Sequence, residues 1–179
     1  MKLEFHGKNI TVRKLKLSDA GDIYRHIRKK DIVKWTSNIP HPYPKGSAVR
    51  FIRGSHFNIR KKKAYNLGIA LNQTGKIIGG IGIRNIDREK KKSAELGYWL
   101  GKEYWNRGYV TEAVKLMLEF AFRTLKLHRI YAEAFKNNHA SNKVLQKAGF
   151  KKEGELREAE YRHGEWQDVC IYSILTTEF

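Results

Sequence analysis

Residues 95–112 read Glu95-Leu-Gly-Tyr-Trp-Leu-Gly-Lys-Glu-Tyr-Trp-Asn-Arg-Gly-Tyr-Val-Thr-Glu112. The stretch ends a predicted strand, crosses a short loop that contains Gly108, and enters a long amphipathic helix without a proline break. Backbone N–H groups at the start of a helix lack intrahelical partners and point outward, so this join favours an anion such as a pyrophosphate. We therefore expect a phosphate-binding loop where the strand meets the helix.

The segments before this stretch predict an antiparallel meander and two helices. Ser18-Asp19 is a plausible N-cap for a helix that ends near Lys29, and the prolines of residues 40–44 break regular structure before a second helix. Residues 72–75 form a turn between two strands. The predicted strands are 9–17, 64–71, 76–84 and 93–100, and the second helix is about 45–60.

After the loop the pattern changes to that of a helix packed along one side on a sheet. The apolar stripe that predicts this helix consists of Val110, Ala113, Val114, Met117, Ala121 and Leu125. A strand at 129–136, a short helix at about 140–148, and strands near 150–163 and 165–176 follow, with a hairpin turn at His163-Gly164. The whole predicts one α/β (α+β) domain over residues 1–179, with a site where the sheet parts around the loop.

Length and composition set limits on the class of protein. At 179 residues, of which 41% are hydrophobic, the chain is long enough for one substantial core. Neither a signal peptide nor a run of membrane length is evident, so we expect a soluble cytoplasmic protein without a membrane partner. The single cysteine, Cys170, has apolar neighbours and fits a buried strand thiol. The histidine spacing indicates no metal site.

The formal net charge of +18 is large for this length. Basic runs occur at 28–30, 60–63 and 90–92. Such a surface attracts polyanions, which makes ribosome or RNA docking a candidate interaction. Solvated helix ends and loop tips explain the same runs, and the sequence does not distinguish RNA binding from growth temperature or genome bias as the cause.

Two common phosphate-binding motifs are excluded. The loop lacks the Gly-Lys-Ser/Thr ending of nucleoside triphosphate loops. It also lacks the Gly-x-Gly-x-x-Gly fingerprint of dinucleotide-binding domains, and no ribose-binding acid follows at the required spacing. The occupant must therefore be identified from the surrounding residues.

Three motifs in order resemble the GNAT N-acetyltransferase superfamily. Residues 105–110 read Trp-Asn-Arg-Gly-Tyr-Val, similar to the Gln/Arg-x-x-Gly-x-Gly/Ala pyrophosphate loop of that superfamily, with departures at Trp105 and Val110. The segment Asn137-Asn-His-Ala-Ser-Asn-Lys-Val-Leu-Gln-Lys-Ala-Gly-Phe150 resembles its Asn-x-x-Ser to Gly-Phe segment. Residues 153–172 and the strand at 95–100 look like the RimJ/RimL-type branch, so the resemblance spans residues 10–175.

The resemblance implies a fold and a reaction. The fold would be a mixed, mostly antiparallel seven-stranded sheet, split around the cofactor and flanked by about four helices. The reaction would be direct transfer of an acetyl group from acetyl-CoA, without a metal, to a protein N-terminal amine such as that of a ribosomal protein. Two alternatives stay open: acetylation of a small amine such as a polyamine or antibiotic, and a ribosome- or RNA-associated binding module without turnover. The resemblance is compatible with both a monomer and a homodimer.

By the same resemblance, acetyl-CoA lies between two strands and meets the loop with its pyrophosphate. Gly108 would permit close approach because it has no Cβ, although a glycine before a helix needs no ligand to explain it. Arg107 could add charge or be solvated. The implied cofactor-binding residues are Trp99, Leu100, Gly101, Asn106, Arg107, Gly108, Tyr109, Val110, Thr111, Asn138 and Ser141.

Asn138 and Ser141 occupy the family's positions at the start of the short helix. The amide would hold pantetheine and the hydroxyl would face the departing sulfur, although Asn and Ser also serve as ordinary helix caps. Many relatives carry a tyrosine acid four residues before the Gly-Phe glycine, where this chain has Leu145. A thiol with a pKa of about 8.5 leaves fairly well as thiolate, so a hydrogen bond from Ser141 could suffice.

The base that deprotonates the amine has two candidates. Glu160 occupies the position of the proposed base in RimL-like enzymes, and Glu95 is the second candidate. Either carboxylate could instead be a solvated strand residue. A terminal amine with a pKa of about 7.8 is roughly a tenth neutral at pH 7, so it needs less help than a lysine. The aromatic residues beside the loop could line an acceptor groove, although aromatic residues beside a sheet opening are most often core, and none is given a catalytic role. They are Tyr98, Trp99, Tyr104, Trp105 and Tyr109.

Overall fold

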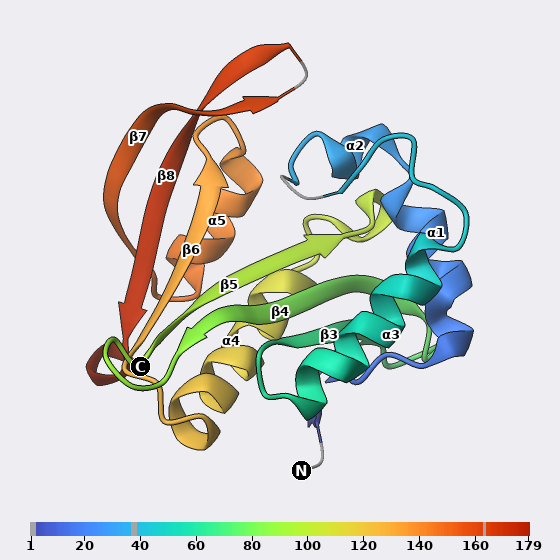
Figure 1. Cartoon of the computed structure of the whole chain (residues 1–179), viewed down its shortest axis with the longest axis horizontal. Coiled ribbons are helices and arrows are strands. Elements are labelled where there is room, and N and C mark those ends of the chain that lie inside the picture. The colour runs from blue at the N-terminus through green and yellow to red at the C-terminus, as the bar shows by residue number, and fades with distance from the viewer. Residues whose placement is uncertain (1–2, 37–38, 163) are drawn as a thin grey trace.

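The computed structural model describes residues 3–36, 39–162 and 164–179. These residues form one mixed sheet in the order β1-β2-β3-β4-β5-β6-β8-β7 (Figure 1). All neighbouring strands are antiparallel except β5 and β6, which are parallel. The strands are β1 Glu4–His6, β2 Ile10–Arg13, β3 Tyr65–Leu71, β4 Ile77–Asp87, β5 Ser93–Leu100, β6 Arg129–Phe135, β7 Lys151–Arg162 and β8 Glu165–Leu175.

Helices cover both faces of the sheet and bury a separate apolar cluster on each. The larger cluster packs α4 and α5 against the sheet, and the smaller one lies under α1 and α3. Figure 1 shows α3 in front of the sheet and α4 behind it. The helices are α1 Ala20–Ile27, α2 Lys30–Val33, α3 Ser47–Arg60, α4 Tyr109–Glu119 and α5 His139–Lys147.

The α/β class, the split mixed sheet and the order of elements are confirmed. Within the described residues the sheet has eight strands rather than the seven expected, because the three-residue β1 pairs with β2 at the sheet edge. A fifth helix, the single turn α2, was also not expected. Both elements are too short to show a hydrophobic period in the sequence, so they form because of the strand or helix against which each one pairs or packs. In the predicted hairpin turn, Gly164 has a φ of 86° and His163 lies outside the described residues.

The glycine-rich strand β4 makes room for an indole. Gly80 lies opposite Trp99 of β5 in the register. A Cβ at Gly80 would lie 2.5 Å from the Trp99 Nε1 atom, which is too close for any side chain to remain without displacement. The lack of a side chain at Gly80 therefore leaves room for the Trp99 indole, which packs against the smaller apolar cluster under α1 and α3.

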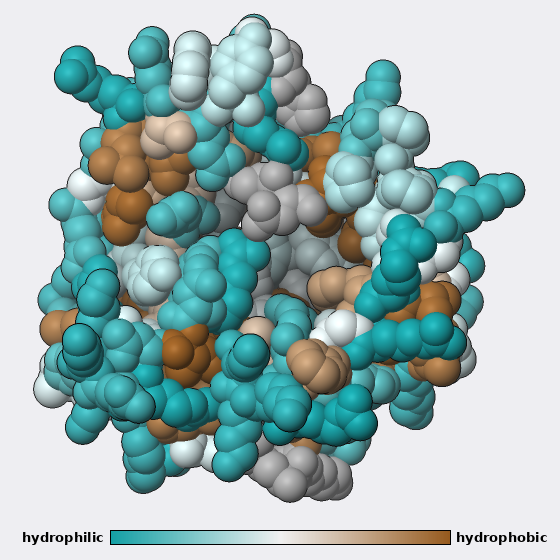
Figure 2. Space-filling model, in the orientation of Figure 1, coloured by the Kyte–Doolittle hydropathy of each residue, from teal (hydrophilic) through white to brown (hydrophobic). Residues whose placement is uncertain are grey.

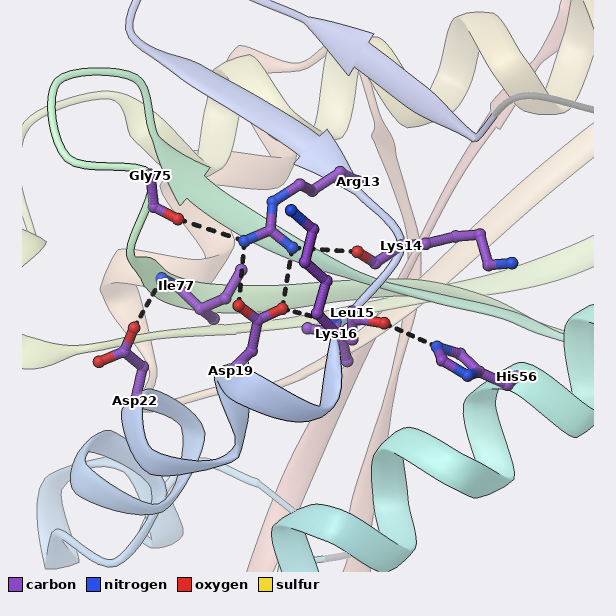
Figure 3. A network of polar contacts seen from close by, with 9 residues as sticks. All are labelled: Arg13, Lys14, Leu15, Lys16, Asp19, Asp22, His56, Gly75 and Ile77. Carbon is purple, nitrogen blue, oxygen red and sulfur yellow. Dashed lines mark hydrogen bonds and ion pairs between the residues drawn. The ribbon is translucent and has the colours of Figure 1, made fainter.

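A buried ion pair fixes the start of α1 (Figure 3). The Arg13 guanidinium donates to both carboxylate oxygens of Asp19, at 2.8 and 3.0 Å, and the Lys16 amide donates to the same carboxylate at 2.7 Å. Arg13 also donates to the Gly75 carbonyl. Asp19 precedes α1 as the sequence predicted, but its carboxylate makes no side-chain cap to that helix. Instead it ties the turn before α1 to the strand β2 and to the β3–β4 turn.

We expect Asp19→Asn to destabilise the fold by about 3 kcal/mol, because it leaves the Arg13 charge half-buried without its partner. Burial alone would raise the pKa of Asp19, but the hydrogen bonds from Arg13 and Lys16 hold that pKa below its ordinary value. The carboxylate therefore stabilises the fold above the unfolded pKa, and this contribution is lost as pH falls through the lower folded pKa. Urea unfolding at pH 7 measures the loss.

A surface ion pair provides the control for Asp19→Asn. Glu119 pairs with Arg123 one helical turn away, and both side chains are at least half exposed. Glu119→Gln should cost no more than about 0.5 kcal/mol. Equal losses in the two variants, or a loss for Asp19→Asn that stays constant down to pH 2, would contradict a buried stabilising pair.

Candidate functional site

The sheet splits between the two parallel strands. Residues β5 93–95 pair with β6 129–131, and the last matched pair is Glu95 with Tyr131. Beyond this pair β5 continues to Leu100 paired only with β4 on its other edge. A cleft of about 1220 Å³ opens there, with walls from β4, β5, β6, α4, α5 and the segment that follows α2. In the view of Figure 1 the surface is mostly hydrophilic and is hollowed between the β7–β8 half and the α1–α2 half (Figure 2).

One end of the cleft is the loop before α4. Asn106 and Gly108 both have left-handed backbones, with φ of 60° and 78°. Such turns direct successive N–H groups toward one point and make an anion-binding concavity. The first bond of the helix runs from the Glu112 amide to the Gly108 carbonyl, so the amides of residues 109–111 precede the helical hydrogen-bond ladder. These donors are suited to a pyrophosphate.

The two departures from the motif have structural explanations. Trp105 donates its indole N–H to the Leu100 carbonyl at 2.8 Å, which closes the loop across its base. Val110 is 9% exposed and packs into the larger apolar cluster. Both side chains therefore hold the loop in place, and the donors that the loop offers to the cleft are its backbone amides.

The start of α5 forms the opposite wall. The Asn138 side chain caps the helix by accepting from the Ser141 amide at 3.1 Å. The Ser141 hydroxyl lies 2.8 Å from the phenolic oxygen of Tyr98, which projects from β5 across the cleft. The cap uses the side-chain carbonyl oxygen of Asn138, and the side-chain N–H groups of Asn138 take no part in it. Tyr98 lines the cleft and also packs against the larger apolar cluster.

The end of the cleft nearest the last β5–β6 pair is acidic. Glu95 is 8% exposed, forms an ion pair with Arg84, and accepts a hydrogen bond from Asn85 at 2.8 Å. Glu160 of β7 lines the same cleft. The two predicted base candidates, far apart in sequence, are thus brought into one cavity, and Glu95 has partners on both carboxylate oxygens.

A third carboxylate, Glu133 of β6, was not predicted. It lies two residues beyond Tyr131, the partner of Glu95, and so shares the sheet face of Glu95. Burial and the negative charges of Glu95 and Glu160 raise the pKa of Glu133, against the opposing effect of Arg84. A raised pKa brings a carboxylate closer to the range in which general bases work. A glutamate between two alanines of a strand, at Ala132-Glu-Ala134, is the signal that could have identified it.

Most predicted residues line the cleft. Gly101 and Arg107 are the two of the predicted set that the described lining does not include; the Gly101 amide donates to the Ile78 carbonyl, and Arg107 is exposed. Two cations that were not predicted, Lys143 and Lys147, lie one turn apart on α5 and border the cleft. The predicted residues that line it are Glu95, Trp99, Leu100, Asn106, Gly108, Tyr109, Val110, Thr111, Asn138, Ser141 and Glu160.

The far side of the cleft is bounded by two elements that are distant in sequence. The Arg162 guanidinium, near the end of β7, donates to the Thr36 carbonyl after α2 at 2.7 Å. Apolar side chains of this region, including Trp35 and Ile39, line the cleft next to Thr36. The hydrogen bond joins the β7–β8 hairpin to the segment that follows α2.

Neither metal ligands nor membrane spans were found in the parts of the chain that the structure describes. Residues 3–36, 39–162 and 164–179 contain no group of three or more His, Cys, Asp or Glu side chains placed to hold a metal ion. None of the described helices is long and apolar enough to cross a membrane. Cys170 is buried and unbridged.

Comparison with known proteins identifies relatives over nearly the whole chain. Residues 9–151 match the acetyltransferase (GNAT) domain family. An uncharacterised N-acetyltransferase, p20, from Bacillus licheniformis is 32% identical over 96% of each chain. The [ribosomal protein uS5]-alanine N-acetyltransferase of Escherichia coli is 27% identical over 78% of this chain and 71% of its own. The microcin C7 self-immunity acetyltransferase MccE, solved with acetyl-CoA and AMP, superposes with a TM-score of 0.85 at 28% identity, covering 94% of this chain and 93% of its own.

Proposed function

Because the chain belongs to the GNAT acetyltransferase family, whose members use acetyl-CoA, we propose that it acetylates the N-terminal α-amine of a protein, such as a ribosomal protein. Transfer is direct, within a ternary complex. The observation that carries this proposal is a single cleft with a helix N-terminus at one end and three carboxylates at the other. The family relationship explains the helix N-terminus as the place of the CoA pyrophosphate. The three carboxylates favour an amine as the acceptor.

The residues present fit CoA as the cosubstrate, which supplies the activated acetyl thioester when bound. The amides of residues 109–111 meet the pyrophosphate, with Gly108 allowing close approach. The edge of β5 beyond Glu95 offers backbone groups to the pantetheine amides, where pairing with β6 has ended. Lys143 and Lys147 supply positive charge to the phosphates from the facing helix.

The acidic end favours an α-amine as acceptor. In a chain with a net charge of +18, a local group of Glu95, Glu133 and Glu160 attracts an ammonium into the cleft. Glu133 then takes a proton from the amine, directly or through water, while Arg84 holds Glu95 in place. An α-amine is roughly a tenth neutral at pH 7 and a lysine amine below about a thousandth, so the former needs the weaker base.

Two other functions remain as outcomes of the test. The likeness to MccE favours a small acceptor as the second candidate, although long-range repulsion by the basic surface opposes free polyamines. The basic surface also suits docking on ribosomal RNA, which would bring the cleft to a neighbouring protein terminus in the cytoplasm.

We expect peptides with a free N-terminal alanine or serine to release CoA thiol from acetyl-CoA far faster than spermidine does. A matched peptide whose N-terminus is formylated and whose lysines are retained is the control, and it should stay inert. Faster turnover of spermidine would identify a small-amine enzyme. Salt-dependent RNA binding without thiol release from any acceptor would instead identify a binding module.

A further inference from the structure

Tyr98 and Ser141 form a pair that spans the cleft from strand to helix. Tyr98 lies on β5 beyond the last β5–β6 pair, and Ser141 lies in the first turn of α5. The phenolic oxygen is 2.8 Å from Ser141 Oγ and 3.3 Å from the Ser141 carbonyl. Both residues line the cleft. The pair thus joins the two walls at the level where the pantetheine arm would pass between them.

Either hydroxyl can donate in the 2.8 Å contact, and the chemistry of the two groups favours Tyr98 as the donor. Burial raises the pKa of Tyr98 above its usual range, so the phenol keeps its proton at any physiological pH and can donate it. A phenol is also a stronger donor than an aliphatic hydroxyl. When Tyr98 donates to Ser141 Oγ, the proton of Ser141 is left for another acceptor, and Ser141 lines the cleft.

We propose that Tyr98 is a positioning residue, which donates to Ser141 Oγ and thereby directs the Ser141 hydroxyl proton toward the sulfur of the departing thiol. This inference rests on the proposed function, because it requires CoA in the cleft. The chain lacks the family's tyrosine acid and has Leu145 at that position. Here a tyrosine from the opposite wall acts instead, through a serine.

The pair stabilises charge without giving up a proton. When the bond between the acetyl carbon and sulfur breaks, its electron pair stays on sulfur, and Ser141 donates a hydrogen bond to that thiolate. Complete transfer from Tyr98 is unfavourable, since a phenol has an ordinary pKa of about 10 and a thiol one of about 8.5. The thiolate takes its proton from solvent after release. Tyr98 therefore affects the rate only through Ser141.

A double-mutant cycle tests this dependence. Tyr98→Phe keeps the ring and removes the hydroxyl, and we expect kcat to fall about tenfold with KM for acetyl-CoA little changed. Ser141→Ala should lower kcat at least as much, and adding Tyr98→Phe to it should have no further effect. Tyr24→Phe, a tyrosine of α1 outside the described cleft lining, is the control and should retain wild-type kinetics. Independent, multiplicative losses would overturn the proposal.

A binding measurement without turnover provides the second readout. We expect the affinity for CoA, relative to desulfo-CoA, to rise between pH 6 and 9 as the bound thiol ionises, because Ser141 favours the thiolate. Isothermal titration should show a smaller rise for Tyr98→Phe and for Ser141→Ala, and a retained rise for Ser141→Thr. If the rise in CoA affinity is the same in Tyr98→Phe as in the wild type, the inference is overturned. If Tyr98→Phe does not fold, an unchanged rise in Ser141→Ala overturns it. Failure of the wild type to bind either ligand would overturn the proposed function instead.

Discussion

Gly108→Glu is expected to weaken acetyl-CoA binding by at least roughly 100-fold. The substitution places a carboxylate beside the amides that would receive the pyrophosphate, and like charges a few ångströms apart at a protein surface repel by about 3–4 kcal/mol. Gly108 is exposed and lines the cleft, so the new side chain needs no room inside the core. Isothermal titration with acetyl-CoA measures the change in affinity.

The chain contains a close control for this substitution. Gly46 precedes α3 as Gly108 precedes α4, with φ of 77° against 78°, and the described cleft lining does not include it. Gly46→Glu should therefore cost the same folding free energy, about 1–2 kcal/mol for a left-handed non-glycine residue, without affecting acetyl-CoA binding.

Gly108→Ala separates backbone strain from charge. No atom lies within 4 Å of the Cβ that it would add, so it should lose stability as Gly46→Glu does but bind acetyl-CoA within about tenfold of the wild type. If Gly108→Glu binds acetyl-CoA as tightly as Gly46→Glu does, the loop before α4 is not the phosphate site.

Glu133→Gln is expected to lower kcat/KM for an N-terminal peptide by about 100-fold or more, as the loss of a general base does. The glutamine keeps the size of the side chain but removes its negative charge and its ability to accept a proton. Because burial and two neighbouring carboxylates raise the pKa of Glu133, the wild-type rate should fall on the acid side as that group becomes protonated. Steady-state kinetics between pH 5 and 9 record both effects.

Glu160→Gln distinguishes Glu133 from the first of the two base candidates, Glu160 and Glu95, that the family resemblance offers. The Glu160 charge raises the pKa of Glu133, so its removal should lower that pKa and move the acid limb of the profile to lower pH. The maximal rate should change little. If Glu160→Gln loses the rate at every pH and Glu133→Gln does not, Glu160 is the base and Glu133 only modifies it.

The elements of the fold could be predicted where the sequence pattern is long. The stripe at 110–125 extends over four turns, and the hairpin of β3 and β4 has both alternation and a glycine turn, so each is recognisable without a partner. The predicted helix does not stay α-helical to its end, because it continues after Glu119 as a π-helical segment, Phe120–Thr124. A change from α-helical to π-helical hydrogen bonding cannot be recognised from the spacing of apolar residues in the sequence.

The site could be predicted only in part. Residues of one segment, such as Asn106 to Thr111, could be predicted as cofactor-binding because the function predicted for them depends on consecutive backbone groups, and most of them line the cleft. The Tyr98–Ser141 pair and Glu133 were not found, because each depends on a side chain from an element distant in sequence.

The sequence by itself predicted a phosphate-binding loop between β5 and α4, the helix that begins there and the family resemblance, because each motif consists of residues near one another along the chain. Only the tertiary structure decided which carboxylates share a cavity and which of them has a raised pKa. Glu95, Glu133 and Glu160 belong to β5, β6 and β7, and the split after the Glu95–Tyr131 pair sets their common environment. Electrostatic interactions depend on distance and burial in space, and neither is encoded in the spacing of residues along the chain.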